Sequence, residues 1–191
     1  MTDTFIGIDQ SYGGFSIAVW VPAQKQLEFH LKAFPAKKYG QGVDRLRAVS
    51  ENILDVFQGI YEKDLEIKHI CMEGYARNSK FRREEAGELA SMVKLTLSVA
   101  TPKPVSYPTV VAPTQLKVFV TGSHRASKED MIAGVKEKWG VETKNDNNAD
   151  SLGLAHIAEA LHTSVTHSPF EDLVLSKLKR HTEQFPVVQA A

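Results

Sequence analysis

The first third of the chain has the hydrophobic pattern of short strands joined by turns. Residues 4–9 form an apolar run that ends in Asp9, which is typical of a strand buried on both faces. Apolar positions then alternate with small or polar ones over 15–21. After the turn at 22–25, residues 27–34 have a third strand-like pattern. These segments predict a meander of antiparallel strands.

Beyond residue 43 the apolar positions recur with helical spacing, and helices alternate with strands. The expected elements are a helix over 44–61, a strand over 67–73, a helix over 84–99, a strand over 105–111, a short helix over 114–120, a helix between Ser127 and Gly140, a helix over 149–164 and a last helix from Ser168. Pro104 and Pro108 cannot donate ladder hydrogen bonds, so their strand is expected to be bent or at an edge. The pattern predicts an α/β fold with a mixed five-stranded sheet and helices on both faces.

Two of the predicted strands end in a carboxylate, Asp9 and Glu73. In open α/β sheets, ligands bind beyond the carboxyl ends of the strands. If the two strands are parallel neighbours, both acids reach one place. The alternative is that each acid simply caps its strand at the solvent edge.

A third acid, Asp150, lies on an apolar helical stripe. It shares that stripe with residues four, seven and eleven positions later, namely Leu154, Ile157 and Leu161. Asp150 should therefore face the sheet, where an unpaired charge is costly and the helix N-terminus gives partial relief. The alternative is a simple N-cap. Asp146 and Asn147, in the preceding loop at 142–148, can project toward the same place, and Gly153 is expected to allow close approach of the helix to the sheet.

Oxygen ligands without a histidine or cysteine cluster suit hard cations such as Mg²⁺ or Mn²⁺. Two such ions, about 4 Å apart, can clamp the attacking and leaving oxygens of a phosphodiester. Directly after Glu73 the chain carries a basic segment, comprising Arg77, Lys80, Arg82 and Arg83. A phosphate backbone that approaches the cations would pass there. The alternative is a solvated loop that precedes a helix.

An ordered set of motifs over residues 4–162 resembles the RuvC family of Holliday-junction resolvases. The motifs are Ile6-Gly7-Ile8-Asp9, Met72-Glu73, Ala112-Pro113 with Lys117, Gly122, Ala126 and Lys128, and Ala149-Asp150-x-Leu152. The resemblance implies an RNase H-like fold and a Mg²⁺-dependent endonuclease with two ions per active site, which Mn²⁺ can replace. It further implies a homodimer that nicks two strands of a four-way DNA junction symmetrically.

Carried over by position, the resemblance implies metal ligation by Asp9, Glu73 and Asp150. The family's fourth acid falls at Asn147, which is a departure from the pattern. Asn147 could coordinate through its amide oxygen, or Asp146 could take over. Lys117 and Lys128 match basic residues that the family uses near the active site for DNA, and Tyr75 is the nearest candidate, offset by one, for a residue that wedges into the junction.

Composition limits the remaining choices. The chain has 191 residues, 42% hydrophobic and 24% charged, which is typical of a soluble globular protein. We expect a nuclease domain over 1–164 and a C-terminal helical extension over 165–191. The single cysteine, Cys71, the absence of a ~20-residue apolar run and an N-terminus unlike a signal peptide favour the cytoplasm and no membrane contact. The resemblance implies that the protein acts in a bacterial cell. Small resolvases of this type are common in phages, so a phage could encode it.

The net charge of zero, from 23 basic and 23 acidic residues, argues against a globally basic nucleic-acid binder. On the present hypothesis several of these acids ligate metal, so the DNA face is still basic. One alternative is a junction-binding protein without catalytic activity, because Asn147 stands where the family has its fourth acid. Another is an actin-like nucleotide-binding ATPase, because Gly7 to Gly14 resembles its first phosphate loop, but such proteins need two domains of this kind.

Overall fold

The structure, a computed structural model, describes residues 1–74, 83–102, 105 and 107–184. The strands are β1 (Thr2–Asp9), β2 (Phe15–Val21), β3 (Gln26–Lys32), β4 (Leu65–Glu73) and β5 (Thr109–Val111). The helices are α1 (Ala36–Tyr39), α2 (Val43–Glu62), α3 (Arg83–Ala100), α4 (Pro113–Thr121), α5 (Lys128–Trp139), α6 (Asp146–Thr163) and α7 (Pro169–Gln184), with a 3₁₀ turn, η1 (Pro22–Gln24), between β2 and β3. In this part of the chain, no helix is both long and apolar enough to cross a membrane.

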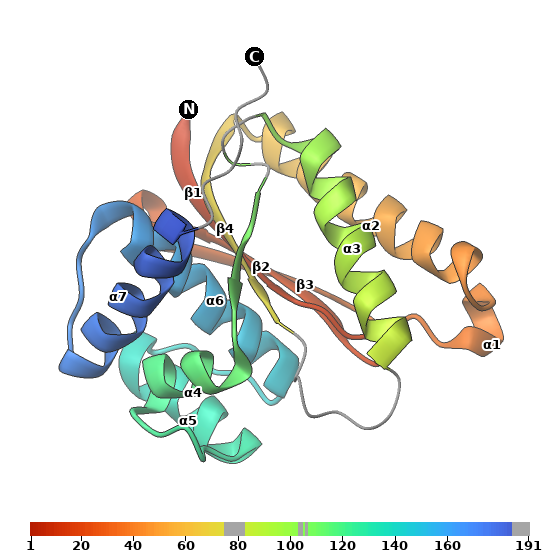
Figure 1. Ribbon diagram of the computed structural model, residues 1–191. Coiled ribbons are helices and arrows are strands. Elements are labelled where there is room, and N and C mark those ends of the chain that lie inside the picture. Colours follow the sequence, from red (N-terminus) through yellow and green to blue (C-terminus); the bar gives the residue numbers. More distant parts are fainter. Residues whose placement is uncertain (75–82, 103–104, 106, 185–191) are drawn as a thin grey trace.

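The strands form one mixed sheet in the order β3-β2-β1-β4-β5 (Figure 1). The first three strands pair antiparallel, as the meander pattern predicts. β4 then pairs parallel with β1, and β5 pairs parallel with β4. This confirms the predicted α/β fold with a mixed five-stranded sheet. It also makes the carboxyl ends of β1 and β4 neighbours.

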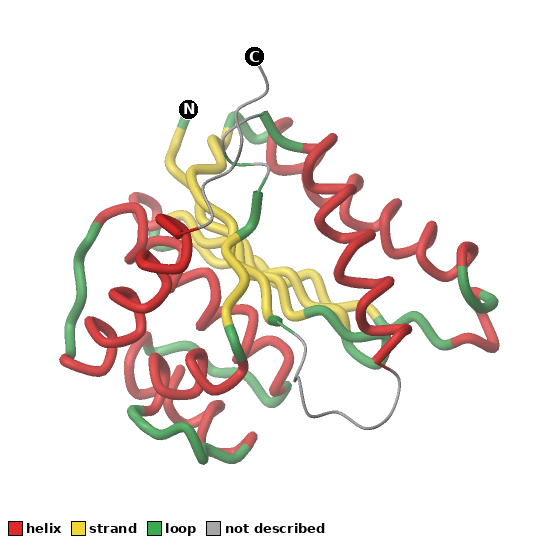
Figure 2. Tube along the Cα trace, viewed as in Figure 1, coloured by secondary structure: helices red, strands yellow, loops and turns green. Residues whose placement is uncertain are grey.

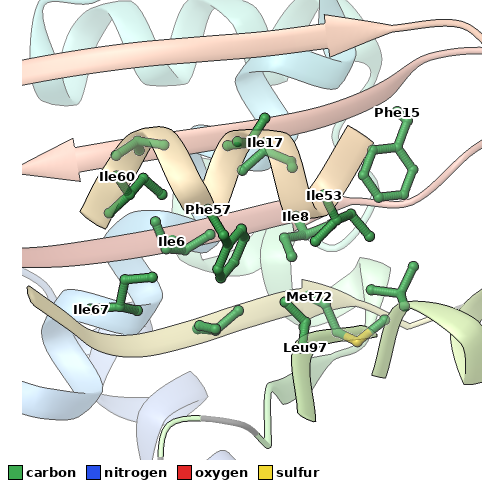
Figure 3. Close-up of a cluster of buried hydrophobic side chains, with 14 of the residues drawn as sticks. Ile6, Ile8, Phe15, Ile17, Ile53, Phe57, Ile60, Ile67, Met72 and Leu97 are labelled. Atoms are coloured by element: carbon green, nitrogen blue, oxygen red, sulfur yellow. The ribbon is translucent and has the colours of Figure 1, made fainter. Parts of the chain in front are cut away.

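Helices α2 and α3 cover one face of the sheet (Figure 1). Every second residue of β1 points to this face, because successive side chains of a strand alternate between its two sides. The core contains aliphatic and aromatic side chains from three strands and both helices, among them Ile6, Ile8, Ile17, Met72, Ile53, Phe57 and Leu97 (Figure 3). Burial of this apolar surface stabilises the sheet against the two helices.

The other face is covered by α6, with α4, α5 and α7 packed around it (Figure 2). Phe5 and Cys71 point to this side, opposite to their strand neighbours. α7 adds Val174, Leu175 and Leu178 to the buried cluster, so it packs as part of this layer against α4 and α6. Helices on both faces agree with the sequence-based expectation.

Three details differ from the sequence-based expectations. α6 begins at Asp146 and not near 149, because the side chain of Asn145 accepts a hydrogen bond from the Asn148 backbone N–H (3.2 Å) and caps the helix there. Gly153 faces α4 and not the sheet, since a methyl group on it would come within 2.8 Å of Leu116. The short helix α1 between β3 and α2 was not predicted.

β5 covers only Thr109–Val111, shorter than the predicted strand over 105–111. It lies at the edge of the sheet, as the two prolines predict, and Pro108 stands directly before its first residue. Because proline has no backbone N–H, the ladder with β4 begins only after it.

Candidate active site

Asp9 and Glu73 lie side by side at one end of the sheet. The parallel register pairs Ile8 with Met72, so the next residue of each strand carries its carboxylate to the same end. The two side chains are close enough to share a hydrogen bond. Asp9 is only 5% exposed, which contradicts the alternative that it merely caps a strand at the solvent edge.

The two carboxyl groups lie in a buried, strongly negative environment. Burial raises the pKa of Asp9 well above its ordinary value, and the charges of Glu73 and Asp150 raise it further. Burial and the charge of Asp150 raise the pKa of Glu73 to about 7, against the lowering effects of its hydrogen bond with Asp9 and of Lys117. Such a cluster favours a positively charged ligand, because clustered carboxylates oppose each other's ionisation.

Asp150 joins this cluster from α6. It lies in the second turn of the helix, four residues after Asp146, and the cap is supplied by Asn145, so Asp150 is not an N-cap. Burial and the charge of Asp146 raise the pKa of Asp150 to about 6, while Lys117 and Lys128 lower it. The half-buried carboxylate thus faces the sheet side, as the helical stripe predicts.

Hydrogen bonds fix α6 against β2 beside the acid pair. Ser16, the register partner of Asp9, donates through Oγ to Asn148 Oδ1 (3.0 Å). The hydroxyl groups of Ser16 and Ser151 also lie 2.8 Å apart within the buried interface. The two bonded residues of α6, Asn148 and Ser151, stand on either side of Asp150 in the sequence, so these contacts hold the backbone of Asp150 in place relative to Asp9.

The two candidates for a fourth ligand differ in their surroundings. Asp146 forms an ion pair with Lys128, which lowers the pKa of Asp146, and the negative charge of Asp146 acts on both Asp9 and Asp150. The side chain of Asn147 instead lies against the β1–β2 loop. A methyl group on Gly14 would come 2.4 Å from Asn147 Nδ2.

Both predicted lysines lie at the carboxylate cluster. Lys117 donates through Nζ to the Ala126 carbonyl (2.6 Å), and its charge lowers the pKa of Glu73 and Asp150. Lys128 is exposed, and its positive charge faces Asp146, Asp150 and Asp9. The pair brings positive charge to the α4–α5 side of the acids.

Gln10 also belongs to the site, although it was not among the predicted residues. Its Nε2 donates to the Glu73 carbonyl (2.7 Å), and its buried Oε1 has no hydrogen-bond partner among the described residues. The sequence signal that could have identified Gln10 is its position directly after Asp9, an acid that ends a strand. Ser16 and Asn148 had no such signal, because they meet across 132 positions of sequence.

Most of the predicted DNA-contacting segment lies outside the described residues, namely Tyr75, Arg77, Lys80 and Arg82. Arg83 is the first residue of α3, but its side chain is likewise outside the described part. These predictions therefore stay predictions.

The chemistry of the donor set fits a hard divalent cation. The cluster offers carboxylate oxygens that repel one another, and the adjacent pair of Asp9 and Glu73 could hold one ion between them. As arranged here, no three acidic, histidine or cysteine side chains of the described chain form a ready metal-binding group. The fit thus rests on the donor types and on the Asp9–Glu73 pair.

A separate cavity of about 530 Å³ lies between β2, α5, α6 and α7. It is lined by aromatic rings, including Trp20, which pairs with Phe5 far from the Asp9 end of β1. Its polar groups satisfy one another: Trp20 donates to Glu159 (2.8 Å), and Lys138 pairs with Glu171 (2.6 Å). This cavity is distinct from the carboxylate cluster.

Comparison with known proteins identifies the fold. No protein-family model matches the chain, and no curated protein matches its sequence. A Thermus thermophilus RuvC structure in complex with a Holliday junction substrate superposes with a TM-score of 0.54 at 19% identity, covering 81% of this chain and 90% of that one. A second Thermus thermophilus RuvC structure gives a TM-score of 0.52 at 18% identity, covering 94% and 97%. The chain therefore has a RuvC-like fold of the RNase H-like type.

Proposed function

We propose that the protein is a metal-dependent, structure-selective DNA endonuclease that resolves four-way junctions and acts on related branched DNA. The observation that carries the proposal is the adjacent pair of Asp9 and Glu73 at the ends of β1 and β4, with the charge of Asp150 from α6 acting on both. It is supported by the shared fold with RuvC, one structure of which was solved with a Holliday junction.

In this proposal Asp9, Glu73 and Asp150 would hold two Mg²⁺ ions, which Mn²⁺ could replace, and Asp9 would be a ligand of both. Bound there, the ions would supply an activated water and stabilise the departing 3′ oxygen of a phosphodiester. Asp146 is favoured over Asn147 as the fourth ligand, because its charge already acts on Asp9 and Asp150.

The chain's own lysines would orient the substrate. Lys117, fixed by the Ala126 carbonyl, lies where its charge can stabilise a phosphate beside Glu73 and Asp150. Lys128 can exchange Asp146 for a phosphate oxygen, since its side chain is exposed. The segment with Tyr75, Arg77, Lys80, Arg82 and Arg83 would guide the backbone toward them.

Symmetric resolution needs two active sites, so we propose a homodimer in the cytoplasm of a bacterial cell, encoded by the bacterium or by a phage. Residues 1–164 would form the nuclease domain of each protomer. Residues 165–191 would form an extension, of which α7 packs on α4 and α6.

The test is cleavage of a synthetic mobile four-way junction, beside a linear duplex of the same sequence, with Mg²⁺. We expect paired nicks in the junction only, and their loss in Asp9→Asn. Asp3→Asn is the matched control, because Asp3 is an exposed acid at the other end of β1 and should leave cleavage unchanged.

Each other outcome points to a different function. Junction binding without nicks in Mg²⁺ or Mn²⁺ would favour an inactive junction-binding protein. ATP hydrolysis without DNA would favour the actin-like alternative. For the fourth ligand, Asp146→Asn should slow cleavage more than Asn147→Ala, and the reverse order would assign the ligand to Asn147.

A further inference from the structure

Three exposed lysines gather at the end of β3 and in α1, and we call Lys32, Lys37 and Lys38 the lysine platform. Within the part of the chain that the structure describes, none of the three has an ion-pair partner. Several other lysines do pair with a carboxylate, namely Lys63, Lys68, Lys128, Lys136 and Lys138. The positive charge of the platform is thus left available to an external partner.

The sequence around the platform is locally basic in a chain of zero net charge. Between positions 32 and 47 there are five basic residues and one acidic residue, Asp44. Arg47 lies 3.4 Å from Asp44, and Arg45 lies 3.9 Å from Glu85 of α3, so the excess positive charge of this segment is that of the three platform lysines. This local excess favours a polyanion, because the field near a surface depends on the charges of that face and not on the net charge.

The platform is anchored to the core and does not extend freely into solvent. Phe34, between Lys32 and α1, is fully buried and packs edge-on against Phe15 (6.1 Å between ring centroids). Arg45 donates through Nε to the Phe34 carbonyl (2.6 Å), and its guanidinium lies 3.6 Å from the centre of the Tyr12 ring. The Phe34 N–H also donates to the Tyr12 carbonyl (2.9 Å).

These contacts connect the platform to the catalytic end of the sheet, because Tyr12 lies in the loop that follows Asp9. The strand register gives the same result. Lys32 pairs with Phe15, while the next residue of β2, Ser16, pairs with Asp9. Lys32 and Asp9 therefore end their strands at the same end of the sheet, with their backbones two strand spacings, or about 10 Å, apart. Their side chains leave opposite faces, Lys32 on the face of Phe15 and Asp9 on the face that α6 covers.

The platform and the other lysines flank the acids from opposite sides. In the strand order, β3 is one edge of the sheet, and Lys117 follows β5 at the other edge. Asp9 and Glu73 lie on β1 and β4, two of the three strands between these edges. Figure 1 shows α1 at the far right of the view and α4 and α5 at the lower left.

We propose that the lysine platform is a second phosphate-binding surface, which holds the DNA backbone on the β3 side of the cleaved phosphate. The inference rests on the proposed nuclease function. Lysine ammonium groups bind phosphates as point charges and do not distinguish sequence, so the platform fixes the path of a junction arm. The separation of about 10 Å between the two strand ends is on the order of a few nucleotide steps, since a strand advances about 3.4 Å along the duplex axis per nucleotide.

The first test compares junction binding by the triple variant Lys32→Gln, Lys37→Gln, Lys38→Gln with that of a control that loses the same charge. The control is Lys25→Gln, Lys177→Gln, Lys179→Gln, with Lys25 at the opposite end of the β2–β3 hairpin. We expect the platform variant to bind about tenfold or more weakly. Its log–log salt dependence should become shallower by about 2 to 3, at about 0.9 per lost phosphate contact.

The second test locates the contact. Because the native Cys71 is buried, Lys38→Cys gives one accessible thiol in the described chain, which can carry a photo-crosslinker. In EDTA, which keeps the junction intact, we expect crosslinks a few nucleotides to one side of the position nicked in Mg²⁺. Lys25→Cys should give none.

The outcomes separate the two proposals. Wild-type protein that neither binds nor nicks the junction overturns the nuclease function and the platform with it. In the other case, the wild type cleaves the junction while the platform variants match their controls in affinity, salt dependence and crosslinking. That result overturns the platform alone, and it favours an acidic protein as the partner of this surface. Thermal melting of each variant checks folding, and the single variant Lys37→Gln repeats the salt titration if the triple variant melts early.

Discussion

Gly7 of β1 lies so close to Ser151 of α6 that a methyl group on Gly7 would come 1.9 Å from the Ser151 carbonyl oxygen and 2.4 Å from the Ala155 backbone nitrogen. Both obstacles are backbone atoms, which cannot move aside as a flexible side chain can. The missing side chain therefore permits α6 to rest directly on the central strand. Because of this close approach, the charge of Asp150, one residue before Ser151, acts on Asp9.

Gly7→Ala should consequently destabilise the fold by about 3 kcal/mol or more, since the added carbon forces helix and strand apart. Gly59→Ala is the matched control. Gly59 lies in α2 with no atom within 4 Å of an added methyl group, so alanine there should stabilise the helix by about 0.5–1 kcal/mol. Urea unfolding of both variants checks the pair, and equal stabilities would contradict the close packing of α6.

Glu73→Gln should separate stability from activity. The carboxylate of Glu73 is buried beside Asp9 and Asp150, so removing its charge relieves repulsion in the metal-free protein. We expect the variant to be about 1–3 kcal/mol more stable than wild type in EDTA, and inactive on junctions.

The same variant tests metal binding without an activity readout. Mg²⁺ at about 100 times its dissociation constant should stabilise the wild type by about 2.7 kcal/mol, and should stabilise Glu73→Gln far less. Glu66→Gln, at the exposed start of β4, is the control and should keep the wild-type response. Equal responses of all three proteins to Mg²⁺ would contradict the role of Glu73 as a ligand.

The sequence allowed the acids of the candidate site to be selected, but not the hydrogen bonds that position the elements carrying them. Asp9 and Glu73 were recognisable because each ends an apolar run, and Asp150 because it interrupts an apolar helical stripe. The start of α6 was misplaced, since the capping role of Asn145 could not be told apart from its polar neighbours. The contact of Ser16 with Asn148 was not predictable, because it depends on how the helix lies across the sheet.

The lysine platform shows a second limit of pattern analysis. α1 is a single turn of four residues without the apolar periodicity that predicts a helix. Its position depends on Phe34, whose neighbours Phe15 and Tyr39 are identified only by the packing. From the sequence alone the exposed lysines resemble an ordinary polar loop, and only the strand register places Lys32 at the same end of the sheet as Asp9.

His69 should make stability depend on pH. Burial, and secondarily the charge of His162, lower the pKa of His69 to about 4, and its Nε2 lies 2.9 Å from Thr109 Oγ1. In the unfolded chain its pKa returns to about 6.5, so below that pH the unfolded state binds a proton that the folded state does not. From pH 7.5 to pH 5 this group should remove about 2 kcal/mol of stability.

Denaturation of His69→Gln at the two pH values isolates that contribution, because the variant should lose about 2 kcal/mol less than the wild type. His124→Gln, an exposed histidine, should behave as the wild type does. If wild type and His69→Gln lost stability equally on acidification, the buried ring would not be the neutral species inferred here.

The outer surface of α3 should carry the proposed dimer contact. Leu95 and Val99 lie one turn apart and are 69% and 78% exposed, and the neighbouring helix α2 exposes Leu54. Apolar side chains grouped in this way favour burial by another surface, and paired cleavage of a junction requires a second copy of the chain. Light scattering of the wild type should give twice the 21.2 kDa chain mass, and Leu95→Glu with Val99→Glu should give one chain mass and unpaired nicks. Leu173→Glu, which adds a charge at an exposed leucine of α7, should stay dimeric. If the Leu95→Glu, Val99→Glu variant kept twice the chain mass and made paired nicks, the dimer contact would lie elsewhere.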